Sequence, residues 1–229
     1  FDFSAPDFHE LAFWEDNATI RFECASDYIE LLEKLTALLG RQPELPDWVY
    51  DGVTLGVQGG TEVCQQKLDT LRRHGVKVNG IWAQDWSGIR MTSFGKRVMW
   101  NWKWNRDLYP QLDERIKAWN AEGVQFLSYI NPYVASDREL CAEAAARGFL
   151  TKDAAGKDYH VEFSEFYAGV IDLTNPQAYE WYKNVIKENL IAFGCNGWMA
   201  DFGEYLPTNT HLHNGVSAEI MHNVWPALW

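Results

Sequence analysis

The sequence lacks the features of several large protein classes. No apolar run approaches the roughly 20 residues that a helix needs to cross a bilayer. Residues 1–10 contain neither a basic segment nor an apolar segment, so no signal peptide is visible. A net charge of -12 with no basic stripe disfavours binding to nucleic-acid phosphates. We therefore expect a cytoplasmic protein without a membrane or nucleic-acid partner.

Cysteine and histidine are also scarce, and their spacing does not favour a metal site. The four cysteines are far apart, and we expect free buried thiols: Cys24, Cys64, Cys141 and Cys195. The six histidines form no HExxH pattern. His211 and His213 make an HxH pair that could hold a metal, but the pair lies in a predicted loop without nearby Cys ligands. We expect no metal and no cofactor.

Apolar and aromatic residues, by contrast, are plentiful. The 229 residues are 47% hydrophobic, which is enough to bury a sizeable core. Aromatic residues make up 15% of the chain, and 12 of them are Trp, many in predicted loops or at strand ends. Core packing is the ordinary explanation for any single Trp, but indole faces in such places also suit the apolar faces of sugar rings.

The N-terminal part of the chain predicts two elements before a linker. Residues 1–24 look extended, with a β-hairpin around the Asp16-Asn17 turn signal, and we interpret them as the tail of a β-sandwich domain. Residues 26–39 have helical spacing, a cap at Ser26 and an end at Gly40. Two prolines follow, so residues 25–47 form a linker helix and linker.

From residue 48 onward strands and helices alternate. Three junctions have a glycine between a helix and the next strand: Gly75, Gly123 and Gly194. We expect strands at 48–57, 76–82, 124–130, 167–173 and from 198, and helices at 61–74, 112–122, 137–147 and 177–193. A long loop at 84–106 and a polar insertion at 152–165 interrupt the series. This order predicts an α/β fold with a parallel sheet.

Within this class we favour a (β/α)8 TIM barrel, because every strand is followed by a loop that carries the unusual residues. A doubly wound sheet is the alternative, but the first strand is not followed by a Gly-rich phosphate loop. Only about four strands are available for the barrel, and closure takes about eight. Residues 48–229 are therefore interpreted as the incomplete N-terminal half of a catalytic barrel.

The predicted strand ends carry amides and carboxylates. They are Gln58 after the first strand, Gln84 and Asp85 after the second, Asn131 after the third, and Asp201 and Glu204 after the last. The carboxyl ends of parallel strands converge on one pocket, where such groups and neighbouring indoles suit sugar hydroxyls. For any one of the amides, a structural hydrogen bond to a loop remains the alternative.

Asp201 is the best candidate for a catalytic carboxylate. It follows the short apolar run at 198–200, where a strand stops before a loop broken by Gly203 and Pro207. Glycoside cleavage needs two carboxyl groups on opposite faces of the anomeric carbon. Asp85 is the only other acidic residue on the same predicted face, and Glu204 is too close in sequence to oppose Asp201, so we expect both to have supporting roles. The alternative for Asp201 is a cap on a following turn.

Residues 89–104 form a basic and aromatic island in an acidic chain. Arg97 and Trp100 are three apart, so one helical turn would place the guanidinium and the indole N–H on the same side. A forked guanidinium and an indole donor suit a sulfonate, phosphate or carboxylate. The alternative is a solvated surface loop.

These residues resemble glycoside hydrolase family 31 and, within it, the bacterial sulfoquinovosidases. Residues 198–204 resemble the family's nucleophile signature, W-x-x-D-[FLM]-[GNS]-E. The resemblance covers essentially the whole chain and includes residues 47–49, 80–86, 96–102 and 129–133. It implies a retaining α-glycosidase that acts on sulfoquinovose glycosides such as sulfoquinovosyl glycerol.

The resemblance also implies roles for individual residues. Asp201 would be the nucleophile, Gln84, Arg97 and Trp100 would recognise the sulfonate, and Gln58 would lie near the sugar hydroxyls. The family's acid/base Asp belongs to a later strand, beyond residue 229, so the fragment alone is expected to be inactive. Two alternatives stay open: an α-glucosidase or α-xylosidase of the same family, and a catalytically inert sugar-binding fragment.

Overall fold

The computed structural model describes residues 1–13 and 19–229, and these form two compact units, Phe1–Leu45 and Pro46–Trp229. The predicted hairpin turn at Asp16-Asn17 lies outside the described residues. Elsewhere in the first 24 residues a pair of backbone hydrogen bonds joins Asp2 and Glu10, both 2.8 Å long. The interpretation of this segment as part of a β-sandwich stays a prediction.

The described part of the first unit contains one helix, α1 (Tyr28–Leu39), which ends at Gly40 as predicted. Its cap is Asp27 instead of Ser26, and the Asp27 carboxylate accepts from the Glu30 backbone N–H at 2.9 Å. Ser26 binds the Glu30 carboxylate instead, through its backbone N–H at 2.8 Å and its hydroxyl at 2.7 Å. The two residues thus satisfy both ends of a reciprocal cap, which the sequence pattern had assigned to Ser26 alone.

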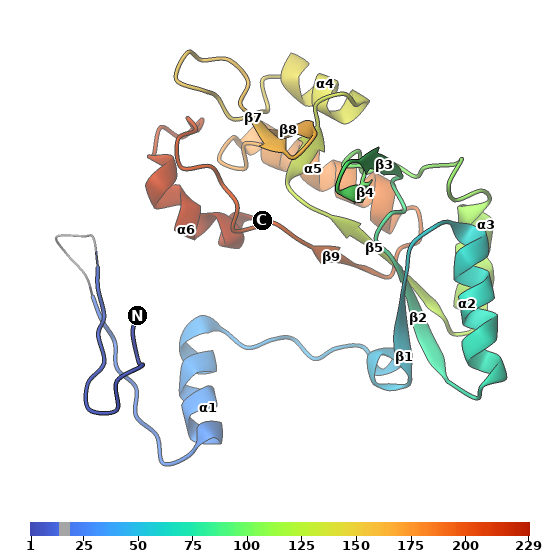
Figure 1. The fold of residues 1–229 in the computed structure, drawn as a ribbon, viewed down its shortest axis with the longest axis horizontal. Coiled ribbons are helices and arrows are strands. Elements are labelled where there is room, and N and C mark those ends of the chain that lie inside the picture. Colours follow the sequence, from blue (N-terminus) through green and yellow to red (C-terminus); the bar gives the residue numbers. More distant parts are fainter. Residues whose placement is uncertain (14–18) are drawn as a thin grey trace. The chain divides into compact units, whose positions relative to one another are not determined.

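The second unit is built on a four-stranded parallel sheet (Figure 1). Its strands are β1 (Val53–Val57), β2 (Val78–Ala83), β5 (Gln125–Ile130) and β9 (Gly197–Ala200). They lie in the order β1-β2-β5-β9, so each strand is added beside the previous one. In a doubly wound sheet the order in which strands are added would instead reverse at a switch point. The order is that of a barrel wall, with four of the about eight strands that closure requires.

Helices lie between these strands in the chain, and two of them pack against the sheet. After β1 comes α2 (Thr61–Arg73), which packs against β1 and β2, and α3 (Leu112–Ala121) packs against β5. The glycines at the three predicted junctions have positive φ angles of 73° at Gly75, 79° at Gly123 and 106° at Gly194, which confirms the helix-glycine-strand pattern. The remaining helices are α4 (Glu139–Ala146), α5 (Pro176–Ile186), its π-helical extension η2 (Lys187–Ile191) and α6 (Ala218–Leu228).

The first predicted strand, 48–57, is only half correct. Asp47–Tyr50 form a 3₁₀ turn, η1, and the strand begins at Val53. The Asn79 side-chain amide holds this turn by donating to the carbonyls of Trp48 at 2.7 Å and Val49 at 3.1 Å. These bonds come from the neighbouring strand, so local spacing could not reveal them.

Two small antiparallel sheets include segments that we predicted to be loops. The loop 84–106 contains the β3–β4 hairpin, β3 (Ile89–Thr92) and β4 (Gly95–Val98). The insertion 152–165 contributes β7 (His160–Phe163) to a sheet of order β6-β8-β7, with β6 (Tyr133–Ala135) and β8 (Phe166–Val170). The predicted strand at 167–173 therefore exists as β8, but it belongs to this separate sheet.

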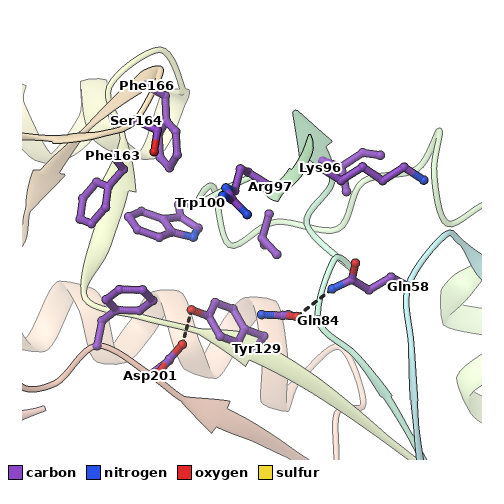
Figure 2. A pocket seen from close by; sticks show the side chains of 13 residues that line it. Gln58, Gln84, Lys96, Arg97, Trp100, Tyr129, Phe163, Ser164, Phe166 and Asp201 are labelled. Carbon is purple, nitrogen blue, oxygen red and sulfur yellow. Dashed lines mark hydrogen bonds between the residues drawn. The ribbon is translucent and has the colours of Figure 1, made fainter. Parts of the chain in front are cut away.

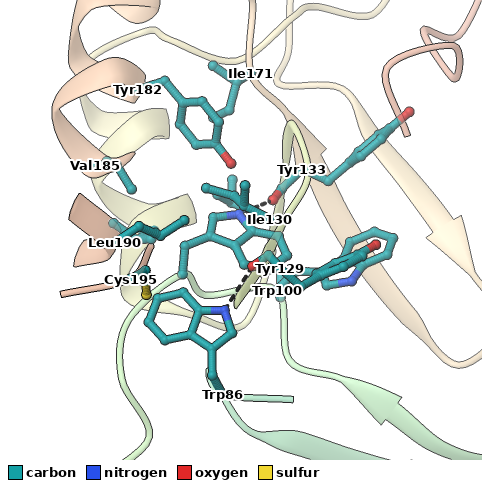
Figure 3. Close-up of a cluster of buried hydrophobic side chains, with 14 of the residues drawn as sticks. Trp86, Trp100, Tyr129, Ile130, Tyr133, Ile171, Tyr182, Val185, Leu190 and Cys195 are labelled. Carbon is teal, nitrogen blue, oxygen red and sulfur yellow. Dashed lines mark hydrogen bonds between the residues drawn. The ribbon is translucent and has the colours of Figure 1, made fainter. Parts of the chain in front are cut away.

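Most of the tryptophans serve the core. Trp86 and Trp102 are fully buried. The indole N–H of Trp86 donates to the backbone carbonyl of Tyr129 at 2.8 Å (Figure 3), and that of Trp102 donates to the carbonyl of Tyr133 at 2.8 Å. The Tyr182 hydroxyl likewise donates to the carbonyl of Asn131. These buried aromatic rings, whose polar atoms are hydrogen-bonded, attach the loop after β2 to the end of β5. They thereby fix the position of this loop at the carboxyl end of the sheet.

The cysteines follow the prediction in part. All four are free; Cys64, Cys141 and Cys195 are buried, whereas Cys24 is exposed. Burial raises the pKa of the Cys64 thiol to about 12 and that of Cys195 to about 11. These two thiols are therefore protonated, inert parts of the core at neutral pH.

Candidate active site

A pocket of about 450 Å³ opens at the carboxyl ends of the parallel strands, between the β3–β4 hairpin and the β7–β8 turn (Figure 2). Its lining includes five of the residues singled out in the sequence: Gln58, Gln84, Arg97, Trp100 and Asp201. The sequence pattern indicates no individual role for the other lining residues: Ile89, Lys96, Val98, Tyr129, Phe163, Ser164, Phe166 and Phe202.

Asp201 is the first residue after β9, and the end of the sheet holds it in place. Its backbone N–H donates to the carbonyl of Ile130 on β5 at 3.0 Å. The next residue, Phe202, has a φ of 57°, the left-handed region that a bulky side chain seldom adopts. The turn at Phe202 takes the chain out of the strand direction, so the half-buried Asp201 carboxylate lines the pocket.

Tyr129 holds the Asp201 carboxylate. Its hydroxyl donates to Oδ2 of Asp201 at 2.7 Å (Figure 2) and accepts from the Asn131 side-chain amide at 3.3 Å. Burial, together with the bond to Asp201, raises the pKa of Tyr129, so the hydroxyl keeps its proton and remains a donor. The sequence pattern indicates no role for Tyr129, although this residue lies near the end of a barrel strand, two residues before Asn131.

Gln58 and Gln84 form a pair at the ends of neighbouring strands. The Nε2 of Gln58 donates to the Oε1 of Gln84 at 2.7 Å. This bond uses one donor of Gln58 and leaves the Gln84 amide N–H groups facing the pocket (Figure 2). The pair therefore presents a fixed set of hydrogen-bond donors to a ligand.

Arg97 and Lys96 bring positive charge to the pocket, and neither side chain has an ion-pair partner among the described residues. In residues 1–13 and 19–229 we find no Asp or Glu within ion-pair distance of either side chain. Arg90, which faces Arg97 across the hairpin, is instead paired with Asp137 at 2.8 Å. An exposed guanidinium that lines a pocket and has no acidic partner is suited to an anionic ligand.

Trp100 stands beside Arg97, held by four aromatic rings. The ring centroids of Tyr133, Phe163, Phe166 and Phe202 lie 5.6, 4.5, 5.2 and 5.4 Å from that of Trp100. Figure 2 shows the indole nitrogen of Trp100 and the guanidinium of Arg97 facing the same space. The predicted helical turn is wrong: Arg97 belongs to strand β4 and Trp100 to the segment after it. Long-range packing, and not local helix geometry, places both donors together.

Asp85 and Glu204 do not line the pocket. Asp85 is buried below the rim, where it accepts from the backbone N–H of Gly59 at 2.8 Å and from the Tyr109 hydroxyl. Asp85 thereby fixes the turn that follows Gln58. Glu204 is exposed, and the orienting role assigned to it stays a prediction. Among the described residues, Asp201 is the one carboxylate that lines the pocket.

Tyr109→Phe is expected to destabilise the full-length protein by about 1–3 kcal/mol at neutral pH, because buried Asp85 loses a donor. Burial already raises the pKa of Asp85 above its ordinary 3.8, although the hydrogen bonds from Tyr109 and Gly59 limit the rise. A carboxyl group with a raised folded pKa stabilises the fold below its unfolded pKa and loses that contribution as pH rises through the folded pKa. The deficit should therefore shrink as acid protonates Asp85.

The measurement is urea unfolding at neutral pH and at the lowest pH at which the protein stays folded. Tyr50→Phe is the control, because Tyr50 is exposed and we find no bond from its hydroxyl to another described residue. A Tyr109→Phe deficit no larger than that of Tyr50→Phe, or one that grows in acid, would contradict the role given to Asp85.

No group of three His, Cys, Asp or Glu residues suited to a metal occurs in the part of the chain that the structure describes. The backbone of His211 pairs with that of Lys152, and the backbone N–H of His213 donates to Asp172 at 2.7 Å. Across the same described ranges, no helix is both long and apolar enough to pass through a membrane.

Comparison with known proteins relates the chain to one family. Residues 43–229 match the family described as "Glycosyl hydrolases family 31 TIM-barrel domain". The chain is 80% identical over its whole length to a sulfoquinovosidase of Escherichia coli strain K12 and 44% identical to one of Agrobacterium fabrum strain C58. In both cases it spans 34% of the relative's length.

A solved structure gives the same picture. A family 31 sulfoquinovosidase from E. rectale, in complex with the aza-sugar inhibitor IFGSQ, superposes with a TM-score of 0.85 at 53% identity. The match covers 90% of this chain and 31% of that one. A family 31 dextranase from Flavobacterium johnsoniae, 22% identical with a TM-score of 0.71, shares the fold. The chain belongs to glycosyl hydrolase family 31, and its parallel sheet is part of the TIM barrel of that family.

Proposed function

We propose that the protein is a retaining α-glycosidase that cleaves α-sulfoquinovosides, such as sulfoquinovosyl glycerol, and releases sulfoquinovose. The observation that carries the proposal is the unpaired guanidinium of Arg97, which shares a pocket with the Asp201 carboxylate. The sulfoquinovosidase relatives support it, since they are 80% and 44% identical over the whole of this chain. The chain spans about a third of their length, so these statements concern the full-length protein.

Asp201 is assigned as the nucleophile. Its carboxylate attacks the anomeric carbon as the bond to the aglycon oxygen breaks, which gives a covalent glycosyl-enzyme. Tyr129 fixes one carboxylate oxygen, Oδ2, and leaves Oδ1 for the attack. Water then cleaves the intermediate and restores the free carboxylate.

The reaction also needs an acid that protonates the departing oxygen and then activates water. Neither Asp85 nor Glu204 lines the pocket, so neither is assigned this role. The family resemblance implies an Asp on a later barrel strand. In a retaining enzyme the two carboxyl groups lie about 5 to 5.5 Å apart on opposite sides of the anomeric carbon. We therefore expect the acid to come from the second wall of the barrel, opposite Asp201.

Recognition of the sulfosugar is assigned to the donors of the pocket rim. Arg97, Trp100 and Gln84 would donate hydrogen bonds to the sulfonate oxygens. Gln58 would hold Gln84 in place and reach the sugar hydroxyls. These donors are preorganised, because the aromatic cluster fixes Trp100 and a hydrogen bond fixes Gln84. A neutral glucoside or xyloside would leave the guanidinium without a partner.

The retaining mechanism predicts the configuration of the first product. Proton NMR of the reaction of full-length protein with an aryl α-sulfoquinovoside should show α-sulfoquinovose first, before mutarotation forms the β anomer. The double displacement through Asp201 inverts the anomeric carbon twice, which restores the α configuration. Initial release of the β anomer would contradict the assignment of Asp201 as a nucleophile.

A further inference from the structure

The β3–β4 hairpin that carries Arg97 has few means of holding its own position. It is a two-stranded sheet of four residue pairs, and such a hairpin is only marginally stable alone. Its base is fixed by a hydrogen bond from the Met99 backbone N–H to the Gly88 carbonyl at 2.8 Å and by one from the Ser87 hydroxyl to the Met99 carbonyl at 2.6 Å. The location of the Arg97 side chain therefore depends on what holds the other end.

Glu165 holds that other end. The backbone N–H of Ser93, in the hairpin turn, donates to both Oε1 and Oε2 of Glu165 at 3.0 Å, and the Ser93 hydroxyl donates to the same carboxylate. These bonds lower the pKa of Glu165, so its carboxylate is ionised at neutral pH. Among the described residues, Glu165 has no Lys or Arg within ion-pair distance, which leaves Ser93 as its partner.

The turn that carries Glu165 is itself part of the pocket. Phe163 and Phe166 flank it, pair with each other as the last residues of β7 and the first of β8, and line the pocket beside Trp100. Ser164 also lines the pocket, with a φ of 59° in the left-handed region. The four-residue turn 163–166 therefore forms one wall of the pocket and holds the hairpin that supplies the guanidinium.

A second contact joins the same two segments. The guanidinium of Arg90, on β3, lies 4.5 Å above the ring of Phe166 and donates to the Asp137 carboxylate at 2.8 Å. Arg90 faces Arg97 across the hairpin. The hairpin is thus held along its side by Arg90 and at its turn by Glu165, and the pocket-lining Arg97 has no described acidic partner of its own.

We propose that Glu165 is a positioning residue for the sulfonate site, acting through the backbone of the β3–β4 hairpin to hold Arg97 over the pocket. Its contact with Ser93 spans the two hairpins and reduces the number of positions that the Arg97 guanidinium can take before substrate binds. Such preorganisation strengthens binding of the anionic glycon without touching it. This inference rests on the proposed function of the pocket.

Glu165→Ala in the full-length protein should raise KM for an aryl α-sulfoquinovoside about tenfold with little change in kcat. The reason is that the substitution weakens binding of the sulfonate and leaves the chemical step at Asp201 unchanged. Activity on an aryl α-glucoside should stay within about twofold. Glu165→Gln keeps one acceptor for Ser93 and should restore most of the loss. Glu162→Ala is the control, since Glu162 is exposed in the same hairpin and we find no hydrogen bond or ion pair to it from the described residues. An equal loss on both substrates would overturn the proposal.

Two further measurements distinguish a role of Glu165 in positioning Arg97 from a general disturbance of the structure. On an Arg97→Ala background, Glu165→Ala should cause no further loss on the sulfoquinovoside, since Glu165 acts through Arg97; an additive loss would overturn the proposal. Amide hydrogen exchange at Ser93 should become at least about tenfold faster in Glu165→Ala, and unchanged exchange would also overturn it. A wild-type protein without preference for the sulfonated glycoside would overturn the proposed function itself, whereas a preference that Glu165→Ala leaves intact overturns this role alone.

Discussion

Asp201→Ala is expected to lower kcat of the full-length protein on an aryl α-sulfoquinovoside by at least about 10⁴-fold, the scale of losing a catalytic nucleophile. Asp201 is the one carboxylate among the described pocket-lining residues, so no neighbour in this part of the chain can replace it. The variant should fold, because the Asp201 side chain is half-buried at the end of the sheet and not part of the core.

Azide tests the role of Asp201 more sharply than the loss of rate does. In Asp201→Ala the missing carboxylate leaves space for this small anion, which can attack the anomeric carbon directly and expel the aryl oxide. A single displacement inverts the carbon, so the product should be the β-glycosyl azide. Glu204→Gln is the control, since Glu204 is exposed outside the pocket lining and its loss should cost less than about tenfold. A Glu204→Gln loss as large as that of Asp201→Ala would contradict the assignment.

Arg97→Ala is expected to reduce kcat/KM on the aryl α-sulfoquinovoside by about 10²- to 10³-fold, the scale of removing one partner of a hydrogen-bonded charge pair. Activity on the aryl α-glucoside should change by less than about threefold, because a neutral glycon does not use the guanidinium. Arg97→Lys should recover only part of the loss, since an ammonium keeps the charge but not the forked pair of donors.

The charge-matched control for Arg97 is Arg106→Ala. Arg106 lies 4.0 Å above the ring of Trp104 and does not line the pocket. The Arg106→Ala substitution removes the same charge from the same long loop, so it measures any general electrostatic effect on the binding of an anionic substrate. Equal losses on both substrates in Arg97→Ala, or an equal sulfoquinovoside loss in Arg106→Ala, would contradict a specific sulfonate contact.

The parallel sheet and much of the pocket could be predicted from the sequence. The glycine junctions and apolar runs are local signals, and they placed Gln58, Gln84 and Asp201 at strand ends that meet in space. Convergence follows from the architecture itself, because parallel strands point their carboxyl ends to the same side whatever their loops do. The hydrogen bond between Gln58 and Gln84 is the direct expression of this rule.

The β3–β4 hairpin could not be predicted in the same way. Its turn, Ser93-Phe94, carries none of the residue pairs that mark a two-residue turn, and the spacing of Arg97 and Trp100 also fits a helix. What decides their position is distant in the sequence: Phe163 and Phe166 hold Trp100, and the carboxylate of Glu165 holds the turn. Contacts over this separation leave no periodic signal in the chain.

Asp85 and Tyr129 show a further limit of prediction from the sequence, which concerns the direction and the partners of single side chains. Gln84 and Asp85 are neighbours at one strand end, and only Gln84 lines the pocket, while Asp85 is buried beneath the rim. Side chains alternate along a strand, so neighbours face opposite sides, but the pattern does not say which side is the pocket. Tyr129 likewise gained its role from a hydrogen bond to Asp201, a residue on another strand.

The central claim is that Arg97 and its neighbours select a sulfonated glycon for Asp201. The most direct test is the ratio of kcat/KM for an aryl α-sulfoquinovoside to that for the matching aryl α-glucoside, measured on the wild-type full-length protein. We predict a ratio of at least about 10³, because a glucoside leaves the pocket donors without their partner. A ratio near or below one, or binding of both sugars without hydrolysis, would contradict the account.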